Sequence, residues 1–513
     1  MFRRLASVGG FTLLSRITGF IRDVLMAAIL GAGPLSDAFL VAFRLPNNFR
    51  AIFAEGAFNL AFLPRYAAMR ETDGHEAAGH FANRVYSWQM ITQVILLLAA
   101  LGAMRPIISV MAPGFAAHPG QLELATSLAR IAFPYLIFTV VAVQLSAMLN
   151  AVGKFAAASA WSIFLNVAMI AALFCAPFFP NAAYAAAWGV FAAGILQLIF
   201  IVWAAARSHL RLRFGRPRWT PEIKQFLIAL GAATFGSASV QIGLFIDNVI
   251  ASFLPSGDLT ALYYADRINQ LPMGTLGIAI GTVLLPEMSS LLAKGDRAGA
   301  DATQNRSAAL ALFLTLPFVA AFLTVPLTIM QGLFAHGAFH LQAAQISAMA
   351  LMAYGVGLPA FVLIRCVSPT FYARGDTATP VRATIASVVV NIALKIALVW
   401  GVHLGAVGIA LGTSIAAWVN VGVLVMLARS RGFLTIDRVF VRSLPPTFLA
   451  TLATGAAALL GVWLSTHLHF DNALFADEAA LACAVVLGGA AFLAVGFVFR
   501  ERLPLGRLAR KRT

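Results

Sequence analysis

Charged side chains are scarce in this 513-residue chain, and that scarcity excludes a water-soluble fold. Only 11% of the residues are Asp, Glu, Lys or Arg, whereas soluble domains carry roughly 25%. The three cysteines lie inside apolar runs and offer neither a disulfide framework nor metal-ligand spacing. The glycine-rich phosphate loop of an ATP-driven motor is also missing. We therefore expect no large soluble domain, no catalytic residues, no metal and no cofactor.

Long apolar segments fill the chain instead, since 60% of the residues are hydrophobic and the mean hydropathy is +0.86. A membrane-spanning helix needs about 20 such residues. The predicted fold class is an all-α membrane protein with about fourteen transmembrane helices. They are expected near 5–30, 35–63, 85–104, 122–150, 155–177, 183–206, 222–253, 259–290, 306–333, 343–372, 380–401, 405–428, 444–466 and 479–499.

The basic residues predict the orientation of these helices. With the N-terminus inside, 27 of the 36 Lys and Arg residues lie in cytoplasmic regions and only Arg105 lies in an outside loop. Such asymmetry follows the positive-inside rule. It predicts a multi-pass membrane protein with both termini in the cytoplasm. Basic residues distributed in this way favour contact with the lipid bilayer and do not form a continuous nucleic-acid surface.

The sequence repeats weakly at an offset of six helices. Arg44-Leu-Pro46 is echoed by Gln270-Leu-Pro272, and Asn166-Val-Ala is echoed by Asn391-Ile-Ala. An even offset gives both halves the same orientation, with a binding site expected between them. We predict an N-terminal lobe at 1–215 (helices 1–6) and a C-terminal lobe at 216–432 (helices 7–12). Helices 13 and 14 with a basic cytoplasmic tail follow at 433–513.

Eight basic residues fall within the predicted spans, where each costs about 2.5–3.5 kcal/mol at a helix centre. Side chains of this kind normally face a protein interior or an aqueous cavity. A guanidinium group donates two parallel hydrogen bonds to phosphate and stays charged, so an arginine-lined cavity selects anions. The alternative is structural ion pairing with Asp23, Glu55 or Asp266. The four proposed substrate-binding residues are Arg16, Arg22, Arg50 and Arg267.

A second intramembrane pair is predicted from Asp247 and Lys395, on the seventh and eleventh helices. The two residues form either a structural salt bridge or part of a coupling site. If they face each other, the lysine ammonium occupies the space of a coupling cation. This argues against a sodium site there.

Short polar and aromatic motifs recur along the chain: Ser15-Arg16, Gly19-Phe20-Ile21-Arg22-Asp23, Asp37-Ala38-Phe39, Leu45-Pro46-Asn47, Ile52-Phe53-Ala54-Glu55-Gly56-Ala57-Phe58, Tyr263-Tyr264-Ala265-Asp266-Arg267 and Phe371-Tyr372-Ala373-Arg374. These motifs resemble those of the MurJ (MviN) family of lipid II flippases. The resemblance extends from the first to about the twelfth helix and implies two six-helix lobes around a central cavity, with the last two helices forming a lipid-tail groove. It implies translocation of undecaprenyl-pyrophosphate-linked peptidoglycan precursor from the cytoplasmic to the periplasmic leaflet. Arg16, Arg22, Arg50 and Arg267 match the family's cavity arginines, and Asp37, Arg44 and Glu55 match supporting positions.

Three other functions stay open at this stage. A flippase for another polyprenyl-linked glycan, such as an O-antigen unit, would share the fold and the anionic substrate. A drug or cation antiporter would want carboxylates where this chain has arginines. A membrane enzyme acting on polyprenyl phosphates would need clustered acids at a membrane face, whereas the adjacent pair Asp477-Glu478 lies in a predicted outside loop. The expected partners are lipid II and the bilayer, together with the peptidoglycan synthesis machinery.

Overall fold

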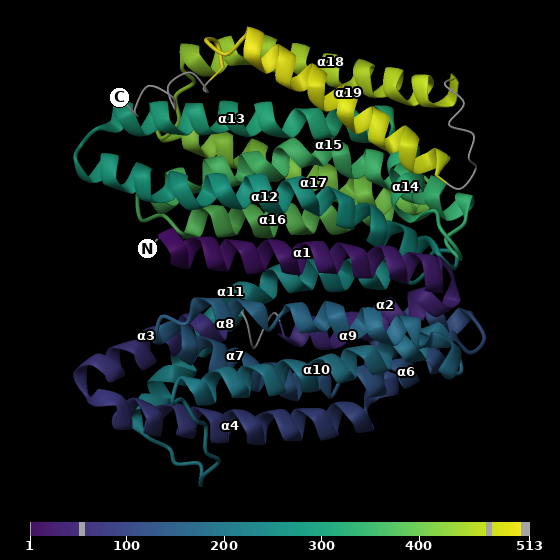
Figure 1. Ribbon diagram of the computed structural model, residues 1–513. Helices are drawn as coiled ribbons and strands as arrows, with labels where there is room; N and C mark the ends of the chain where they lie inside the picture. The colour runs from purple at the N-terminus through teal and green to yellow at the C-terminus, as the bar shows by residue number, and fades with distance from the viewer. Residues whose placement is uncertain (1, 51–56, 468–474, 504–513) are drawn as a thin grey trace. The chain divides into compact units, whose positions relative to one another are not determined.

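The structure is a computed structural model that describes residues 2–50, 57–467 and 475–503. These residues form helices joined by turns and loops, with no strand among them (Figure 1). Polar backbone groups in a bilayer must be satisfied within a segment, which a helix does by itself. The helices of the first half are α1 (Phe2–Leu30), α2 (Pro34–Arg50), α3 (Ala57–Thr72), α4 (Gly74–Gly102), α5 (Met104–Met111), α6 (Gln121–Ala132), α7 (Tyr135–Ala151), α8 (Phe155–Ala160), α9 (Ile163–Phe174), α10 (Ala182–Arg207) and α11 (Pro221–Ala251). Those of the second half are α12 (Asp258–Ala293), α13 (Arg297–Thr324), α14 (Pro326–Phe334), α15 (Leu341–Tyr372), α16 (Ala378–Ile396), α17 (Gly405–Ser430), α18 (Arg438–His467) and α19 (Ala476–Val498), with a π-helical turn, η4, at Ala397–Gly401.

Ten stretches of the described chain are long and apolar enough to cross a membrane. Four further predicted segments lie at α1, α2 with α3, α11 and α12, and these carry all four candidate substrate-binding arginines. In α1 the charges of Arg16, Arg22 and Asp23 offset the surrounding apolar residues. The all-helical membrane fold is therefore confirmed, while the count of fourteen stays a prediction.

Several predicted helices are divided in the structure. The segment expected at 122–150 breaks between α6 and α7 at Pro134, and the one at 306–333 breaks at Val325, directly before Pro326. Proline lacks a backbone N–H and its ring clashes with the preceding turn, which favours a break at these two positions, although other helices such as α2 and α12 continue through a proline. The segment expected at 155–177 breaks at Trp161 and Ser162, and we have no physical account of that break.

The chain divides into two compact units, 1–257 and 258–513, each of which has its own core. In the first unit, aromatic rings from α3, α4 and α11 pack together: Phe62 stacks on Phe58 and Phe81, and Phe226 meets all three edge-on. Buried polar side chains add hydrogen bonds between helices, such as that from Gln144 Nε2 to the carbonyl oxygen of Ala82 at 2.8 Å. Both features are typical of helix packing without water.

In the second unit, α15 packs against α12, α13 and α17. The contact with α17 is close because Gly357 has no side chain: a Cβ there would lie 2.5 Å from the hydroxyl oxygen of Ser414. That hydroxyl donates to the carbonyl oxygen of Ala353 at 2.6 Å. Helices α18 and α19 lie side by side at the outer face of this unit, where α18 contacts α13 (Figure 1).

Candidate functional site

Arg22 lies at the centre of a polar network inside the first unit. It is 5% exposed, and its Nη2 forms an ion pair of 2.7 Å with Asp23 Oδ1. Its Nη1 donates to Asn166 Oδ1 on α9 at 2.9 Å, and Asn166 Nδ2 donates to the carbonyl oxygen of Ser15 at the same distance. Breaking one member of a buried ion pair costs about 3–5 kcal/mol. The network therefore fixes α1 against α9 and orients the guanidinium group.

Arg16 lies on a different face of α1 from Arg22. A separation of six residues on an α-helix turns two side chains about 120° apart, and the structure shows the result: Arg22 is buried, whereas Arg16 is exposed on the surface of the first unit. Neither a hydrogen bond nor an ion pair joins the Arg16 side chain to any residue that the structure describes. Its donors therefore face outward from the unit.

Arg50 ends α2 and is oriented by a neighbour on the same helix. Its Nη2 and Nε donate to Asn47 Oδ1 at 2.7 and 3.2 Å. Arg44, two turns earlier, donates from Nη1 to Asn248 Oδ1 on α11 at 2.8 Å. Asparagine is a neutral acceptor, so these bonds orient a guanidinium group without neutralising it. Glu55, the predicted supporting acid, lies outside the described residues.

Asp37 has a structural contact that its sequence position alone does not reveal. The side chain is 2% exposed, and its Oδ2 accepts a hydrogen bond of 2.7 Å from the backbone N–H of Gly257. Gly257 has φ +97°, a conformation that favours glycine. The carboxylate thus ties the first turn of α2 to the turn that follows α11.

Arg267 lies on α12 in the second unit, next to an aromatic ring. Its Nη2 and Nε donate to the Tyr263 hydroxyl oxygen at 2.7 and 3.0 Å, and its guanidinium carbon lies 4.9 Å from the centre of that ring. The neighbouring acid Asp266 accepts a hydrogen bond from Gln270 Nε2. A tyrosine at this spacing positions the arginine and, like Asn47, leaves its charge intact.

Asp247 and Lys395 belong to different units. Asp247 is half-buried on α11, and Lys395 is completely buried on α16, two residues before η4. A Cβ on Gly412 would lie 2.8 Å from Lys395 Cγ, so α17 approaches the lysine stem closely only because glycine stands there. The predicted pairing of the two residues stays a prediction.

The structure therefore gathers Arg22, Arg44 and Arg50 into the first unit with polar partners, shows Arg16 on that unit's surface and places Arg267 in the second. The sequence did not predict that Asn47, Asn166 and Asn248 are the hydrogen-bond partners of these arginines. Asn47 and Tyr263 stand three and four residues before their arginines, a spacing that indicates contact on a helix. No spacing of this kind indicates the contacts of Asn166 and Asn248, because both residues are far from their arginines in the sequence. Among the described residues no group of three His, Cys, Asp or Glu could hold a metal ion.

Comparison with known proteins places this arrangement in context. The family model described as "Lipid II flippase MurJ" matches residues 26–476. A probable lipid II flippase of Rhizobium meliloti is 41% identical over 97% of this chain and 94% of its own length. A lipid II flippase of Burkholderia cenocepacia is 32% identical over 92% and 91%.

Two solved structures share the fold. A lipid II flippase in an inward closed conformation aligns with a TM-score of 0.77 at 24% identity, over 96% of this chain and 99% of that one. An inward-facing multidrug transporter of the MATE family aligns with a TM-score of 0.68 at 18% identity, over 81% and 94%. At sequence identities this low, the two comparisons show similarity of the fold alone.

Proposed function

Because the chain belongs to the MurJ family of lipid II flippases, we propose that Arg16, Arg22, Arg50 and Arg267 bind the pyrophosphate of lipid II while the protein carries it across the membrane. The activity is that of its family, translocation of the lipid-linked peptidoglycan precursor, and its relatives are transporters. The substrate is lipid II, and the protein is a multi-pass protein of the bacterial inner membrane.

The observation that supports the arginine proposal is the way these residues are held. Asn47 and Tyr263 orient Arg50 and Arg267 through neutral oxygen atoms, and these bonds do not themselves neutralise the guanidinium groups. Arg16 faces outward. Arg22 has used three of its five N–H donors on Asp23 and Asn166 within the described structure. We therefore propose that Arg22 has two roles: it positions neighbouring groups of the site and it binds the substrate.

The proposed mechanism is alternating access. A pyrophosphate that contacts these arginines offsets their positive charge, in addition to the ion pair that Arg22 already makes with Asp23. Binding thus favours closure of the cavity around the headgroup, and release restores the open form. We propose fourteen transmembrane helices, with lobes at 1–215 and 216–432 that move against each other and with 433–513 as an appended pair of helices and a tail.

Supporting residues act on this site indirectly. Asp37 anchors the turn after α11, Arg44 contacts that helix through Asn248, and Glu55 supplies a carboxylate near Arg50 in sequence. Asp247 and Lys395 both fall within the lobe predicted at 216–432, and we propose that they form either a structural ion pair or part of a coupling site. Both termini face the cytoplasm, transport runs from the cytoplasmic to the periplasmic leaflet, and the peptidoglycan synthesis machinery receives the product.

Depletion in the native bacterium, combined with leaflet-resolved measurement of lipid II, tests the proposal. Loss of the protein should strand lipid II in the cytoplasmic leaflet. A plasmid copy should restore the outer pool, whereas Arg16→Gln, Arg50→Gln and Arg267→Gln variants at normal abundance should not. Accumulation of a different polyprenyl-linked glycan with normal lipid II would favour the rival flippase function. Full growth with all four arginines changed to Gln would overturn the pyrophosphate site.

A further inference from the structure

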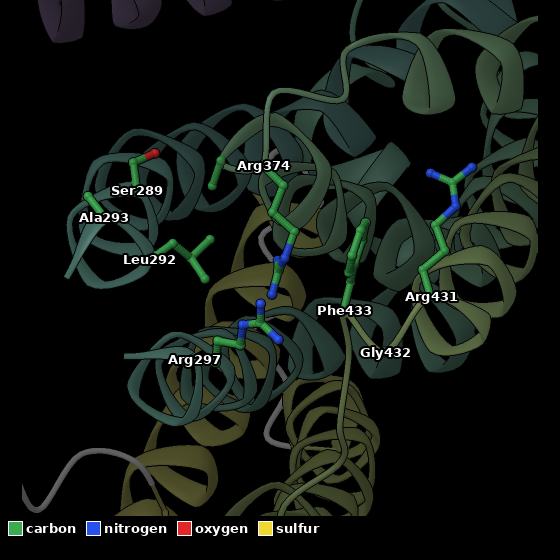
Figure 2. Close-up of a pocket in the computed structure, with 9 residues that line it drawn as sticks. Ser289, Leu292, Ala293, Arg297, Arg374, Arg431, Gly432 and Phe433 are labelled. Carbon is green, nitrogen blue, oxygen red and sulfur yellow. The ribbon is translucent and has the colours of Figure 1, made fainter. Parts of the chain in front are cut away.

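A cavity of about 570 Å³ lies at one end of the second unit, and its lining includes none of the candidate site residues described above. It is formed where α12 ends, α13 begins, and α15 and α17 end. Three arginines line it and no carboxylate does. The lining is Ser289, Leu292, Ala293, Arg297, Ala373, Arg374, Arg431, Gly432 and Phe433 (Figure 2).

Two of these arginines face each other. Figure 2 shows the guanidinium groups of Arg297 and Arg374 turned toward one another across the cavity, while that of Arg431 lies beyond Phe433 and is directed away. Arg431 is accounted for, because its Nη1 binds Asp376 Oδ2 at 2.5 Å. Like charges that face each other repel, and this repulsion is strongest where the side chains are shielded from water. An anion between the two groups would offset this repulsion.

Arg374 is held in place by the protein. Its Nη1 donates to the carbonyl oxygen of Thr370 at 2.8 Å, and its guanidinium carbon lies 4.6 Å from the centre of the Phe433 ring. The side chain is only 16% exposed, and its nearest acid, Asp301, lies 4.0 Å away. Burial lowers the pKa of Arg374, Asp301 acts against that shift, and Arg297 adds to it. The group thus carries a charge that Asp301 compensates only in part.

The Arg297 side chain, in contrast, has no comparable hydrogen bond or ring contact with the described residues. It is exposed at the first position of α13, and no hydrogen bond or ion pair connects its side chain to another described residue. A helix N-terminus disfavours a cation, so the residue lowers stability where it stands. The Asp296 carboxylate already caps this helix by accepting a hydrogen bond of 2.7 Å from the Gly299 N–H, so it is the Arg297 guanidinium group that favours a negative ligand at this point.

We propose that this cavity binds a phosphate group, held between Arg297 and Arg374 with the Ser289 hydroxyl as a further donor. The volume exceeds that of a bare phosphate and suits a phosphate with an attached group. The cavity also lies at the ends of spanning helices, the level at which lipid headgroups are found. An acidic phospholipid headgroup and a free phosphate share the chemistry that this site recognises.

The test uses the purified full-length protein. In one arm, native mass spectrometry counts phosphatidylglycerol and phosphatidylcholine retained from mixed nanodiscs; in the other, inorganic phosphate is titrated against chloride while the melting temperature is followed. Arg297→Gln should weaken whichever ligand binds by about tenfold, because a charge-assisted hydrogen bond is lost. Arg429→Gln, an exposed arginine on the last turn of α17 outside the cavity lining, is the matched control.

Arg297→Gln is decisive because the side chain makes no described bond whose loss could unfold the protein, whereas Arg374→Gln removes the Phe433 contact as well. Loss of phosphatidylglycerol retention identifies a headgroup site, and loss of the phosphate-induced rise in melting temperature identifies a free-phosphate site. Either result supports the proposal. Equal behaviour of the wild type and Arg297→Gln in both arms would overturn it.

Discussion

Arg267 and Tyr263 stand one helical turn apart on α12, and two guanidinium nitrogens share the single tyrosine hydroxyl at 2.7 and 3.0 Å. The ring lies against the same guanidinium group, so one residue both orients and partly desolvates the other. Because the phenol oxygen is neutral, this contact limits the arginine to one orientation without reducing its charge.

Tyr263→Phe should lower flipping about tenfold at normal abundance. It keeps the ring but removes a hydrogen bond to a charged group, which is worth about 1.5–3 kcal/mol. Leaflet-resolved lipid II in a depleted strain measures the effect. Tyr264→Phe is the matched control, since its ring packs against Phe334 and Phe339. Equal activity of the two variants would contradict a positioning role for Tyr263.

Arg22 and Asp23 allow a test that separates binding from structure. Arg22→Gln alone leaves a buried carboxylate without its cation and should reduce abundance, since this costs about 3–5 kcal/mol. Arg22→Gln combined with Asp23→Asn should restore abundance and still fail to support growth, because the phosphate ligand is missing. Complementation with an immunoblot gives both readouts. Growth of the double variant would show that the pair is purely structural.

Cysteine labelling checks the orientation. Ser256 follows α11, Ser430 ends α17, and both are exposed. With the native cysteines replaced, a cysteine at Ser256 should react with a membrane-impermeant maleimide on intact spheroplasts, and one at Ser430 only after lysis. Replacement of the native residues is needed because Cys175 is exposed. Labelling of position 430 from outside would reverse the assigned topology.

Asp376 predicts how stability depends on pH. The pKa of its carboxyl falls from 3.8 to about 2, chiefly because the Thr379 hydroxyl and backbone N–H donate to it, with Arg431 adding a smaller effect. A lowered pKa favours the folded state above the unfolded value, and that contribution is lost as pH falls through about 2. The melting temperature of Asp376→Asn should therefore lie below that of the wild type at about pH 6.

The same difference in melting temperature should shrink as the pH approaches about 2. Asp73→Asn is the matched control, because Asp73 precedes α4 and makes no capping hydrogen bond through its side chain. A difference between Asp376→Asn and the wild type that stays constant over the whole pH range would show that the Thr379 contacts do not depend on ionisation.

The features that could be predicted from the sequence are those that depend on residues close together in the chain. Apolar runs gave the helices, and the motifs around Arg22, Glu55 and Arg267 gave the family, which the comparisons confirm. It did not predict the division of helices at Pro134 and Val325, because long apolar runs conceal a break that one proline introduces.

Contacts between helices that are far apart in the sequence could not be predicted, for a different reason. Asn166 stands 144 residues from Arg22 and is one of many asparagines that hydropathy alone cannot rank. The cavity between Arg297 and Arg374 depends on four helix ends meeting. The sequence offered only a weak indication of it: the basic loops that form it were all predicted to lie on the cytoplasmic side.

The contact between α1 and α9 also bears on how the chain is made. Ribosomes add about 5–20 residues per second, so the 144 residues between Arg22 and Asn166 delay their meeting by about 7–29 seconds. During that time the first helix has Asp23 as an adjacent counterion but no amide partner. The Asp23 carboxylate thus gives Arg22 a counterion until Asn166 is synthesised.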